Sequence, residues 1–386
     1  MKKNQRFFKM LVLLVFFLPG LSAQTTFEVL VSSRGTNAVK KYDLDGNYLG
    51  DFVASGDGGL NGTEDILFHP DGSVLVSGFN NTKIKRYDGE TGAFIGDFSS
   101  GYNLDTPSKM SIGPDDLVYV TQWGTSQNKV VRFDLDGNFV DEFTSTGVSN
   151  GLSHLWDADG NFYISAYGNG GNGTIQKFDP DGNSLGTFIN STYLQGPTGI
   201  WVDSAGDMLV EDWTVGKVLR YNSQGIYQGV FLTGMTNPEG IAFTPDGHML
   251  IGDWGQDAVH EFDSDGNHIG IFTSGNALTD PNSVKIREVA ISSAVMETKQ
   301  ETGFKVSPTL SAGTFQIEVN LKQKSQIQLY VSALNGQLIH VIQPEINVSG
   351  LTQYEWIPAP ELPSGEYFIW LIHDKIPSCQ KIILTR

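Results

Sequence analysis

Aromatic side chains recur at one point of a repeated sequence pattern. The chain contains six copies of a repeated segment, and Gly252 belongs to the last copy. The residue two positions after Gly252 and its equivalents in the other copies are Arg34, Phe79, Trp123, Tyr167, Trp213 and Trp254. A concave surface lined by aromatic rings and a few polar groups is the usual composition of a ligand site, and such surfaces suit sugars or amphipathic small molecules. The alternative is that these rings pack between repeats, since a repeated aromatic residue is often part of the core.

A second point of the pattern, directly after a proline or its equivalent, carries a polar side chain in five of the six repeats. This set contains Asn282, Glu64, Ser108, Leu152, Thr198 and Glu239. The following position adds Asp65 and Lys109, and Asp212 and Asp253 directly precede two of the aromatic residues. We expect these groups to lie at the same face as the aromatic set, and we include Lys109 with that set as a candidate ligand contact.

The spacing of the repeats indicates how these side chains are positioned. Short basic-aromatic segments such as KKYDLDG and VRFDLDG place aromatic residues 41–46 positions apart, at Tyr42, Tyr87, Phe133, Phe178, Tyr221 and Phe262. Each repeat divides into four short strands rich in Val, Ile, Phe and Tyr, bounded by Gly, Asp, Asn and Pro. Six copies with this period predict an all-β, six-bladed β-propeller over residues 24–289.

The DLDGN, DPDGN and DSDGN turns invite a calcium interpretation, because they resemble half of an EF-hand loop. They lack the glutamate that ends such a loop, and each stands where a hairpin needs a tight turn. We therefore interpret them as turns, in which Asp bonds its own backbone and Gly supplies a positive φ.

The first repeat is incomplete. It begins at Phe27 with a segment that matches a second strand, and the missing first strand matches DPNSVKIRE from Asp280. We predict that residues 282–287 pair with the strand that begins at Phe27. This pairing closes the ring and removes an open sheet edge.

The ends of the chain suggest export. Residues 1–23 combine four basic residues with the apolar run Met10–Leu18, which is typical of a secretory signal peptide and too short for a membrane span. The single cysteine, Cys379, excludes an intrachain disulfide. Residues 24–302 carry 15 basic and 37 acidic side chains, and this charge disfavours nucleic acid as a partner. We expect a monomer with no transmembrane segment once the signal is removed.

The amino-acid composition changes after residue 289. Residues 290–303 are polar and lack aromatic residues, which is typical of a linker. Residues 304–386 alternate apolar and polar positions between NG and PSG turn signals, and they predict a small β-sandwich.

Two resemblances follow from these motifs. The starts Pro197-Thr198-Gly199-Ile200 and Pro238-Glu239-Gly240-Ile241, the strands ending in Asp212 and Asp253, and the closing R/K-[FY]-D-x-x-G resemble NHL repeats. The tail, with SP…GTF, IQLY, NGQLI, LPSGEYF and KIILTR, resembles the C-terminal sorting domain of type IX secretion cargo in Bacteroidetes. This second resemblance implies the type IX secretion machinery as a partner, passage through the periplasm, and a secreted or cell-surface location.

The propeller superfold also includes lactonases and streptogramin lyases. The gluconolactonase family, which this chain resembles only in part, binds a divalent metal through Glu, Asn and Asp side chains at the channel mouth. The resemblance implies Glu64 or Glu239, Asn282, and Asp212 or Asp253 as metal ligands, with Ca²⁺ as the expected ion.

Two function hypotheses remain open. The first is a non-catalytic propeller that binds a glycan, peptide or protein on its aromatic face. The second is a metal-dependent lactonase-like hydrolase or a lyase acting at the same mouth. The sequence contains no G-x-S-x-G elbow, P-loop, CxxC or HExxH motif, so no complete catalytic set can be assembled, and binding is favoured over catalysis.

Overall fold

The computed structural model describes residues 25–124, 126–169, 171–290, 303–333, 338–373 and 376–385. These residues form two compact units, one of residues 26–289 and one of the residues from 290 onward. The predicted signal peptide and residues 291–302 of the predicted linker lie outside the described residues. In the ranges given above, no helix has the length and apolar character needed to span a membrane.

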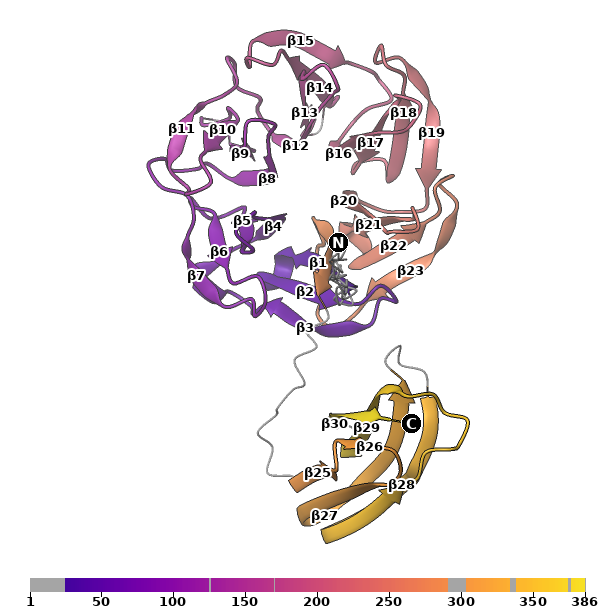
Figure 1. Cartoon of the computed structure of the whole chain (residues 1–386). Helices are drawn as coiled ribbons and strands as arrows, with labels where there is room; N and C mark the ends of the chain where they lie inside the picture. Colours follow the sequence, from indigo (N-terminus) through magenta and orange to yellow (C-terminus); the bar gives the residue numbers. More distant parts are fainter. Residues whose placement is uncertain are drawn as a thin grey trace, which may run out of the picture. The chain divides into compact units, whose positions relative to one another are not determined.

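Residues 26–289 contain six four-stranded sheets within the described chain (Figure 1). The first sheet has the order β24 (Val284–Ala290), β1 (Thr25–Ser33), β2 (Ala38–Tyr42) and β3 (Tyr48–Val53). The second has β4 (Thr63–Phe68), β5 (Val74–Gly78), β6 (Lys85–Tyr87) and β7 (Phe94–Asp97). The third has β8 (Pro107–Ile112), β9 (Val118–Gln122), β10 (Val131–Phe133) and β11 (Phe139–Glu142).

The remaining sheets of this unit follow the same plan. The fourth has β12 (Gly151–Trp156), β13 (Phe162–Ala166), β14 (Thr174–Phe178) and β15 (Ser184–Ile189). The fifth has β16 (Pro197–Val202), β17 (Met208–Asp212), β18 (Lys217–Tyr221) and β19 (Tyr227–Thr233). The sixth has β20 (Pro238–Phe243), β21 (Met249–Asp253), β22 (Ala258–Phe262) and β23 (His268–Ser274). Three short 3₁₀ turns complete the unit: η1 (Arg34–Thr36), η2 (Asp57–Gly59) and η3 (Trp254–Gln256).

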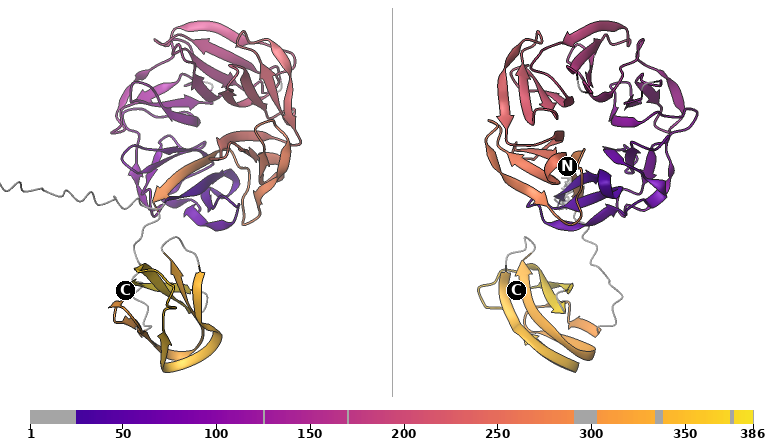
Figure 2. Two further views of the ribbon diagram at one scale, coloured as in Figure 1. Left: turned by 45° about the vertical axis from the view of Figure 1, so that its right-hand side comes forward. Right: turned by 180° about the vertical axis from the view of Figure 1, so that it is seen from behind.

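The sheets surround a common axis as the blades of a β-propeller, and the view from behind shows the same ring (Figures 1 and 2). In each blade the chain runs outward, so β4, β8, β12, β16 and β20 face the axis and β7, β11, β15, β19 and β23 lie at the perimeter. The second strands β5, β9, β17 and β21 are buried along their whole length, because they are covered on both faces by neighbouring blades. The repeat period thus predicted the propeller architecture correctly.

The two ends of this unit meet in the first blade. β24 lies beside β1, which is the closure predicted from the incomplete first repeat. Two further contacts hold the joint, since the backbone N–H of Ser32 donates to Ser283 O at 2.9 Å and the N–H of Asn282 donates to Ser32 Oγ at 3.1 Å.

The hydrophobic core of this unit consists of clusters between adjacent blades rather than one central core. The aromatic residues that define the repeat period lie in these clusters, and all are fully buried: Tyr42, Tyr87, Phe133, Phe178, Tyr221 and Phe262. The cluster that contains Tyr42 also contains Leu250 of the sixth blade and Val284 of β24, so the ring is closed by packing as well as by strand pairing.

The DxDG segments form the tight turns that the sequence predicts. In the turn after β2, Asp43 Oδ1 accepts hydrogen bonds from the backbone N–H groups of Asp45 and Asn47. Gly46 has a φ of 78°, and a Cβ at this position would overlap the carbonyl oxygen of Phe272 in the sixth blade. These residues are therefore required by the turn and by the close approach of the neighbouring blade.

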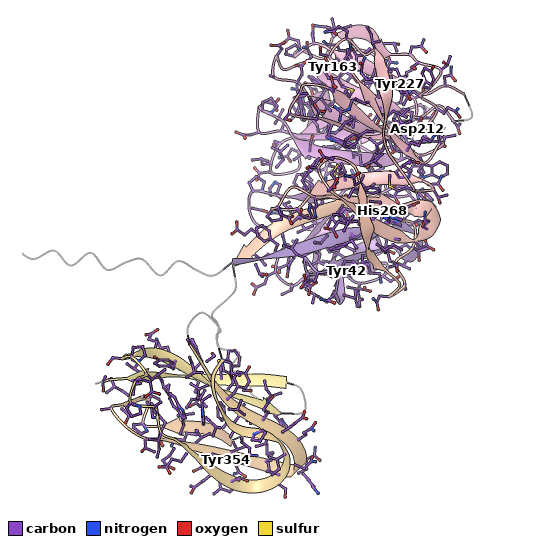
Figure 3. The ribbon with its side chains drawn as sticks, turned by 90° about the vertical axis from the view of Figure 1, so that its right-hand side faces the viewer. Tyr42, Tyr163, Asp212, Tyr227, His268 and Tyr354 are labelled. Carbon is purple, nitrogen blue, oxygen red and sulfur yellow. The ribbon has the colours of Figure 1, made fainter. Side chains whose placement is uncertain are left out.

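The second unit is all-β, and the predicted small β-sandwich stays a prediction. Its described residues form one sheet with the order β25 (Gly303–Ser307), β27 (Phe315–Ala333), β29 (Gly365–His373), β30 (Ile376–Leu384) and β26 (Leu310–Ser311), and β28 (Leu338–Trp356) pairs with β27. The sheet is continuous because β27 is 19 residues long and pairs with β25 along its first half and with β29 along its second. One apolar core, which includes Phe315 and Trp356, joins both halves; Tyr354, labelled in Figure 3, packs against it.

We predict that the propeller requires β24. A chain that ends at Ala290 should unfold in one cooperative thermal transition, whereas a chain that ends at Thr279 should lack that transition. The shorter chain loses the strand beside β1 and exposes the cluster around Val284, a loss comparable to the total stability of about 5–15 kcal/mol of a typical domain. Calorimetry of the two chains tests this, and equal melting temperatures would show that closure is dispensable.

Candidate ligand-binding site

The six residues of the aromatic set lie at equivalent points of the six blades. Each follows directly after the second strand of its blade, as Phe79 follows β5 and Trp213 follows β17. A backbone hydrogen bond fixes each one to the loop that leads into the first strand of the same blade. The N–H groups of Phe79, Trp123, Tyr167, Trp213 and Trp254 donate to the carbonyl oxygens of Gly62, Thr106, Asn150, Gly196 and Asn237 at 2.7–3.0 Å. The corresponding bond of Arg34, to Asp280 O, is 3.3 Å long. The repeated bond places all six side chains at the same level.

These side chains form a closed ring of contacts. The ring centroids of Phe79 and Trp123, Tyr167 and Trp213, and Trp213 and Trp254 are each 6.0 Å apart, and those of Trp123 and Tyr167 are 5.3 Å apart. Arg34 completes the circle, because its guanidinium carbon lies 4.0 Å from the Phe79 centroid and 5.1 Å from the Trp254 centroid. We call Arg34, Phe79, Trp123, Tyr167, Trp213 and Trp254 the aromatic ring.

The aromatic ring lines a cavity of about 200 Å³ together with Glu64, Leu152, Thr198, Glu239 and Asn282. All six ring residues are half-buried, whereas these five are buried, so the five form the floor of the cavity and the ring forms its wall. A cavity of about 150 Å³ suffices to hold a molecule the size of benzene. The partial exposure of the ring fits a binding surface, since the aromatic residues that fill the blade interfaces are fully buried.

The floor residues come from the strands that face the axis. Glu64, Leu152, Thr198 and Glu239 are the second residues of β4, β12, β16 and β20, and Asn282 lies just before β24. Ser108, the equivalent residue of β8, does not line the cavity, because its hydroxyl turns to the carbonyl oxygens of Thr121 and Gly151.

Two cations neutralise part of the floor. Arg34 Nη1 donates to Glu64 Oε2 at 2.5 Å, and Asn282 Nδ2 donates to the same oxygen at 3.0 Å. In the sequence analysis, Lys109 is among the candidate ligand contacts. In the structure Lys109 does not line the cavity but lies buried beside it. Its Nζ donates to Asn282 O at 2.6 Å and lies 3.1 Å from Glu239 Oε1 and 3.8 Å from Glu64 Oε1. Lys109 therefore positions the floor and is not a candidate ligand contact.

Burial changes the acidity of two glutamates near the axis. Burial raises the pKa of Glu239 to about 8, against the attraction of Lys109 and with added repulsion from Glu64. Burial likewise raises the pKa of Glu211 to about 7. Burial alone would lower the pKa of Lys109, but the carboxylates of Glu239, Glu64 and Asp65 raise it above its ordinary value. Lys109 is thus held as an ammonium beside the floor, and burial makes Glu239 harder to ionise than a free glutamate.

Two polar atoms of the floor lack hydrogen-bond partners within the described chain. Asn282 Oδ1 is buried without one, and Glu239 Oε1 forms no aligned hydrogen bond even though Lys109 Nζ lies nearby. Buried polar atoms are nearly always satisfied, and leaving one unpaired costs about 1–3 kcal/mol. Both residues line the cavity, but these two atoms are themselves buried and lie beneath its surface.

The five predicted metal ligands do not assemble into one site. Asp212 and Asp253 are fully buried, and their carboxylates accept backbone N–H groups of the adjacent loops, including Gln195 and Gly196 for Asp212 and Thr236 and Asn237 for Asp253. Asp212 is labelled in Figure 3. Successive residues of an extended chain point to opposite sides. Asp212 and Asp253 therefore point away from the cavity, and the residues that follow them, Trp213 and Trp254, belong to the aromatic ring.

The remaining donors also do not fit a divalent cation. Glu64 and Glu239 already contact the ammonium of Lys109, and Glu64 is bonded to Arg34 as well. Among the residues that the structure describes, no group of three or more His, Cys, Asp or Glu side chains has metal-binding geometry. We therefore derive no chemistry through a metal at this site.

One functional candidate escaped the sequence reasoning. Glu211 occupies a position that carries Ser77, Thr121 and Ser165 in other blades, and its buried Oε2 accepts the N–H of Gly240 at 2.9 Å. Four of the other repeats carry a hydroxyl group at this position and the sixth blade carries Gly252, so the carboxylate stands out in an alignment of the repeats. Gly240, with a φ of 78°, allows this contact.

Comparisons with known proteins establish the fold and leave the activity open. No protein-family model matches the chain, and no curated protein matches it. Among solved structures, the chain is similar to one in a nidogen/laminin complex, with 15% identity, a TM-score of 0.54, and coverage of 67% of this chain and 98% of that one. A protein of unknown function from Bacteroides caccae gives 14% identity, a TM-score of 0.54, and coverage of 68% and 98%. A streptogramin B lyase gives 12% identity, a TM-score of 0.50, and coverage of 68% and 90%. These neighbours include a chain from a protein complex and a lyase.

We predict a pH dependence of stability that Glu239 carries. The pKa of Glu239 is raised from an unfolded value of 4.5 to about 8, so the folded state binds its proton more tightly. This contribution to the free energy of unfolding is fully present below pH 4.5 and is lost as the pH rises to about 8. Urea unfolding between pH 5 and pH 9 should therefore show a steeper decline for the native chain than for Glu239→Gln.

Leu152→Ala is the matched control, because it weakens the same floor without removing a titratable group. Its stability should follow the native pH profile at a lower level. Parallel profiles for the native chain and Glu239→Gln would contradict the assignment.

Proposed function

We propose that this chain is a secreted or cell-surface protein whose six-bladed propeller binds one group of a glycan, peptide or protein ligand inside the aromatic ring. The observation that carries the proposal is the closed ring of six half-buried side chains around a cavity of about 200 Å³ with polar residues in its floor. The apolar walls favour the body of a ligand, and the polar floor favours a polar group at its tip.

The pairing of the floor residues supports binding over metal-dependent hydrolysis. Glu64 is held by Arg34 and Asn282, and Lys109 lies between the two glutamates. These contacts give a rigid floor that is formed before a ligand arrives, which reduces the entropic cost of binding.

A second candidate function rests on Glu239. A buried carboxyl group with a pKa of about 8 in a cavity is suited to general acid or base catalysis. A lyase or hydrolase at this site would use Glu239 directly. Glu239→Gln separates the two functions, because it abolishes turnover by an enzyme but leaves a binding protein able to hold ligands through the aromatic ring.

We predict that the aromatic ring contributes to ligand affinity more than to stability. A panel of monosaccharides, amino acids and amines, screened by thermal shift, identifies a ligand. Trp213→Ala should then weaken its binding by about 2 kcal/mol or more, as expected for a central aromatic contact, with little change in melting temperature. Isothermal titration calorimetry measures the affinity.

Tyr193→Ala is the matched control, since Tyr193 is exposed and stacks on Tyr227 away from the ring. Its affinity should equal that of the native chain. A loss of about 3–5 kcal/mol of stability in each of the alanine variants of Trp123, Trp213 and Trp254 would instead identify the ring as interface packing.

We further propose that the second unit directs export, on the strength of its resemblance to sorting domains of type IX cargo. A chain that ends at Ala290 should then fold but stay in the periplasm of a host with that secretion system, while the full chain reaches the surface. Fractionation and surface labelling measure this. Surface delivery of the shortened chain would reject the sorting role.

A further inference from the structure

The fifth and sixth blades have a second cavity between them, of about 410 Å³, which shares no lining residue with the aromatic ring. Ligand pockets usually measure about 300–1,000 Å³, so this cavity is large enough for a small molecule. We propose that it binds a neutral phenolic compound, whose ring packs between the two blades and whose hydroxyl group bonds to Asp203 and Arg220. The inference concerns a different site from the proposed function and does not depend on it.

The second cavity lies at the opposite end of the blades from the aromatic ring. The ring residues follow the second strand of each blade, whereas this cavity is lined by turns between first and second strands, which include Asp203 after β16 and Gly247 before β21. In an antiparallel pair, these two positions are at opposite ends of the second strand. Two lining residues, Val202 and Phe243, are 45% and 49% exposed, so the cavity opens to solvent.

The third blade shows what fills this space in a complete interface. Tyr119 of β9 packs against Phe143 of its own blade and Trp156 of the next, with ring centroids 5.0 and 4.9 Å apart. Its hydroxyl group donates to Asp115 Oδ2 at 3.0 Å and accepts from Arg132 Nη1 at 3.2 Å. A phenol side chain therefore fills the interface between the third and fourth blades and bonds to an acid and an arginine.

The fourth blade repeats this arrangement. Tyr163 of β13 packs against Phe188 with ring centroids 5.0 Å apart, and its hydroxyl group donates to Asp157 Oδ2 at 3.0 Å. Asp157 is the first residue after β12, and Asp203 is the first residue after β16 in the fifth blade. The acid that holds the phenol in the fourth blade thus has an equivalent beside the second cavity.

The fifth blade keeps the surroundings of this phenol but lacks its ring. Leu209 of β17 pairs with Arg220 of β18, and this is the position that a tyrosine holds in the third and fourth blades. The two rings that contact the tyrosine in the third blade have equivalents here, Phe231 and Phe243, and both line the cavity. Because Leu209 is shorter than tyrosine and has no ring, the space that a phenol fills in the other two blades is open in this one.

The polar partners of a phenol hydroxyl group are present and have free capacity. Arg220 Nη1 donates to Asp203 Oδ2 at 2.5 Å and to Asp207 Oδ2 at 3.2 Å. The Nε and Nη2 atoms of Arg220 form no hydrogen bond within the described chain and are not among its buried unpaired atoms. A hydroxyl group can accept from this guanidinium and donate to Asp203, because it carries one donor and two lone pairs. Two carboxylates surround one guanidinium, so the site favours a neutral ligand over an anion.

Calorimetric titration of the full chain tests the inference. The probe is 2-(4-hydroxyphenyl)ethanol, and the matched analogues without the phenolic O–H are 2-phenylethanol and 2-(4-methoxyphenyl)ethanol. We expect the phenol to bind and each analogue to bind about tenfold more weakly, because each lacks the donor to the carboxylate. Equal binding of all three compounds would overturn the inference.

Variants of the cavity locate the binding. Leu209→Tyr supplies the missing ring, as Tyr163 does in the neighbouring blade, so it should melt no lower than the native chain and should lose phenol binding at least about tenfold. Asp203→Asn should weaken binding about tenfold and keep the turn, since Asn222 accepts the same two backbone N–H groups in a turn of the same blade. Leu185→Tyr adds a ring at an exposed position of β15 and is the matched control, which should bind as the native chain does.

Trp213→Ala separates the second cavity from the aromatic ring. Phenol binding that survives Trp213→Ala and is lost in Leu209→Tyr supports the inference. Binding that is lost in Trp213→Ala and kept in Leu209→Tyr would place the phenol in the aromatic ring, which overturns the inference and supports the proposed function. Loss in both variants or in neither would also overturn the inference, and so would a native chain that does not bind the phenol at about 10 mM.

Discussion

The pairing of β24 with β1 is the constraint on which the rest of this propeller depends. It joins residues that lie more than 240 positions apart, through contacts such as Ser32 with Asn282 and Ser283. Without it, the interface between the sixth and first blades would lose Val284, and the ring would have two open edges. The same pairing brings Asn282 beside Glu64. The floor of the cavity is therefore complete only when the ring is closed.

The floor shows how a buried charge network can be both costly and specific. Moving charged groups out of water is unfavourable, and here Lys109 is shared between Glu239 and Glu64 while Arg34 is bonded to Glu64 alone. The compensation is incomplete at Glu239, because burial raises its pKa in spite of the attraction of Lys109.

One fold can host different functions, because function depends on the residues of the site. The neighbours include a chain from a nidogen/laminin complex and a streptogramin B lyase, and at 12–15% identity they share with this chain its fold alone. The functional argument therefore rests on the cavity. In this chain an ammonium and a guanidinium occupy the carboxylates that a metal would need, and aromatic faces take the place of further polar groups.

The sequence by itself determined the repeat, the four strands of each blade, the closure and the membership of the aromatic ring. These features depend on local patterns, because strand periodicity and turn residues act over a few positions and the repeat multiplies the signal. Glu64, Glu239 and Asn282 hold equivalent positions in the repeats, which predicts that they lie together. In the structure all three line one cavity.

Only the tertiary structure decided which polar groups face that cavity and in which charge state. Asp212 and Asp253 turn to backbone N–H groups, Lys109 lies behind the floor, and the two halves of the second unit share one sheet through β27. Lys109 meets Glu239 and Asn282 across the axis, at separations of more than a hundred residues. Such contacts, and the burial that raises the pKa of Glu239, arise only when all blades are in place, so no local pattern in the chain encodes them.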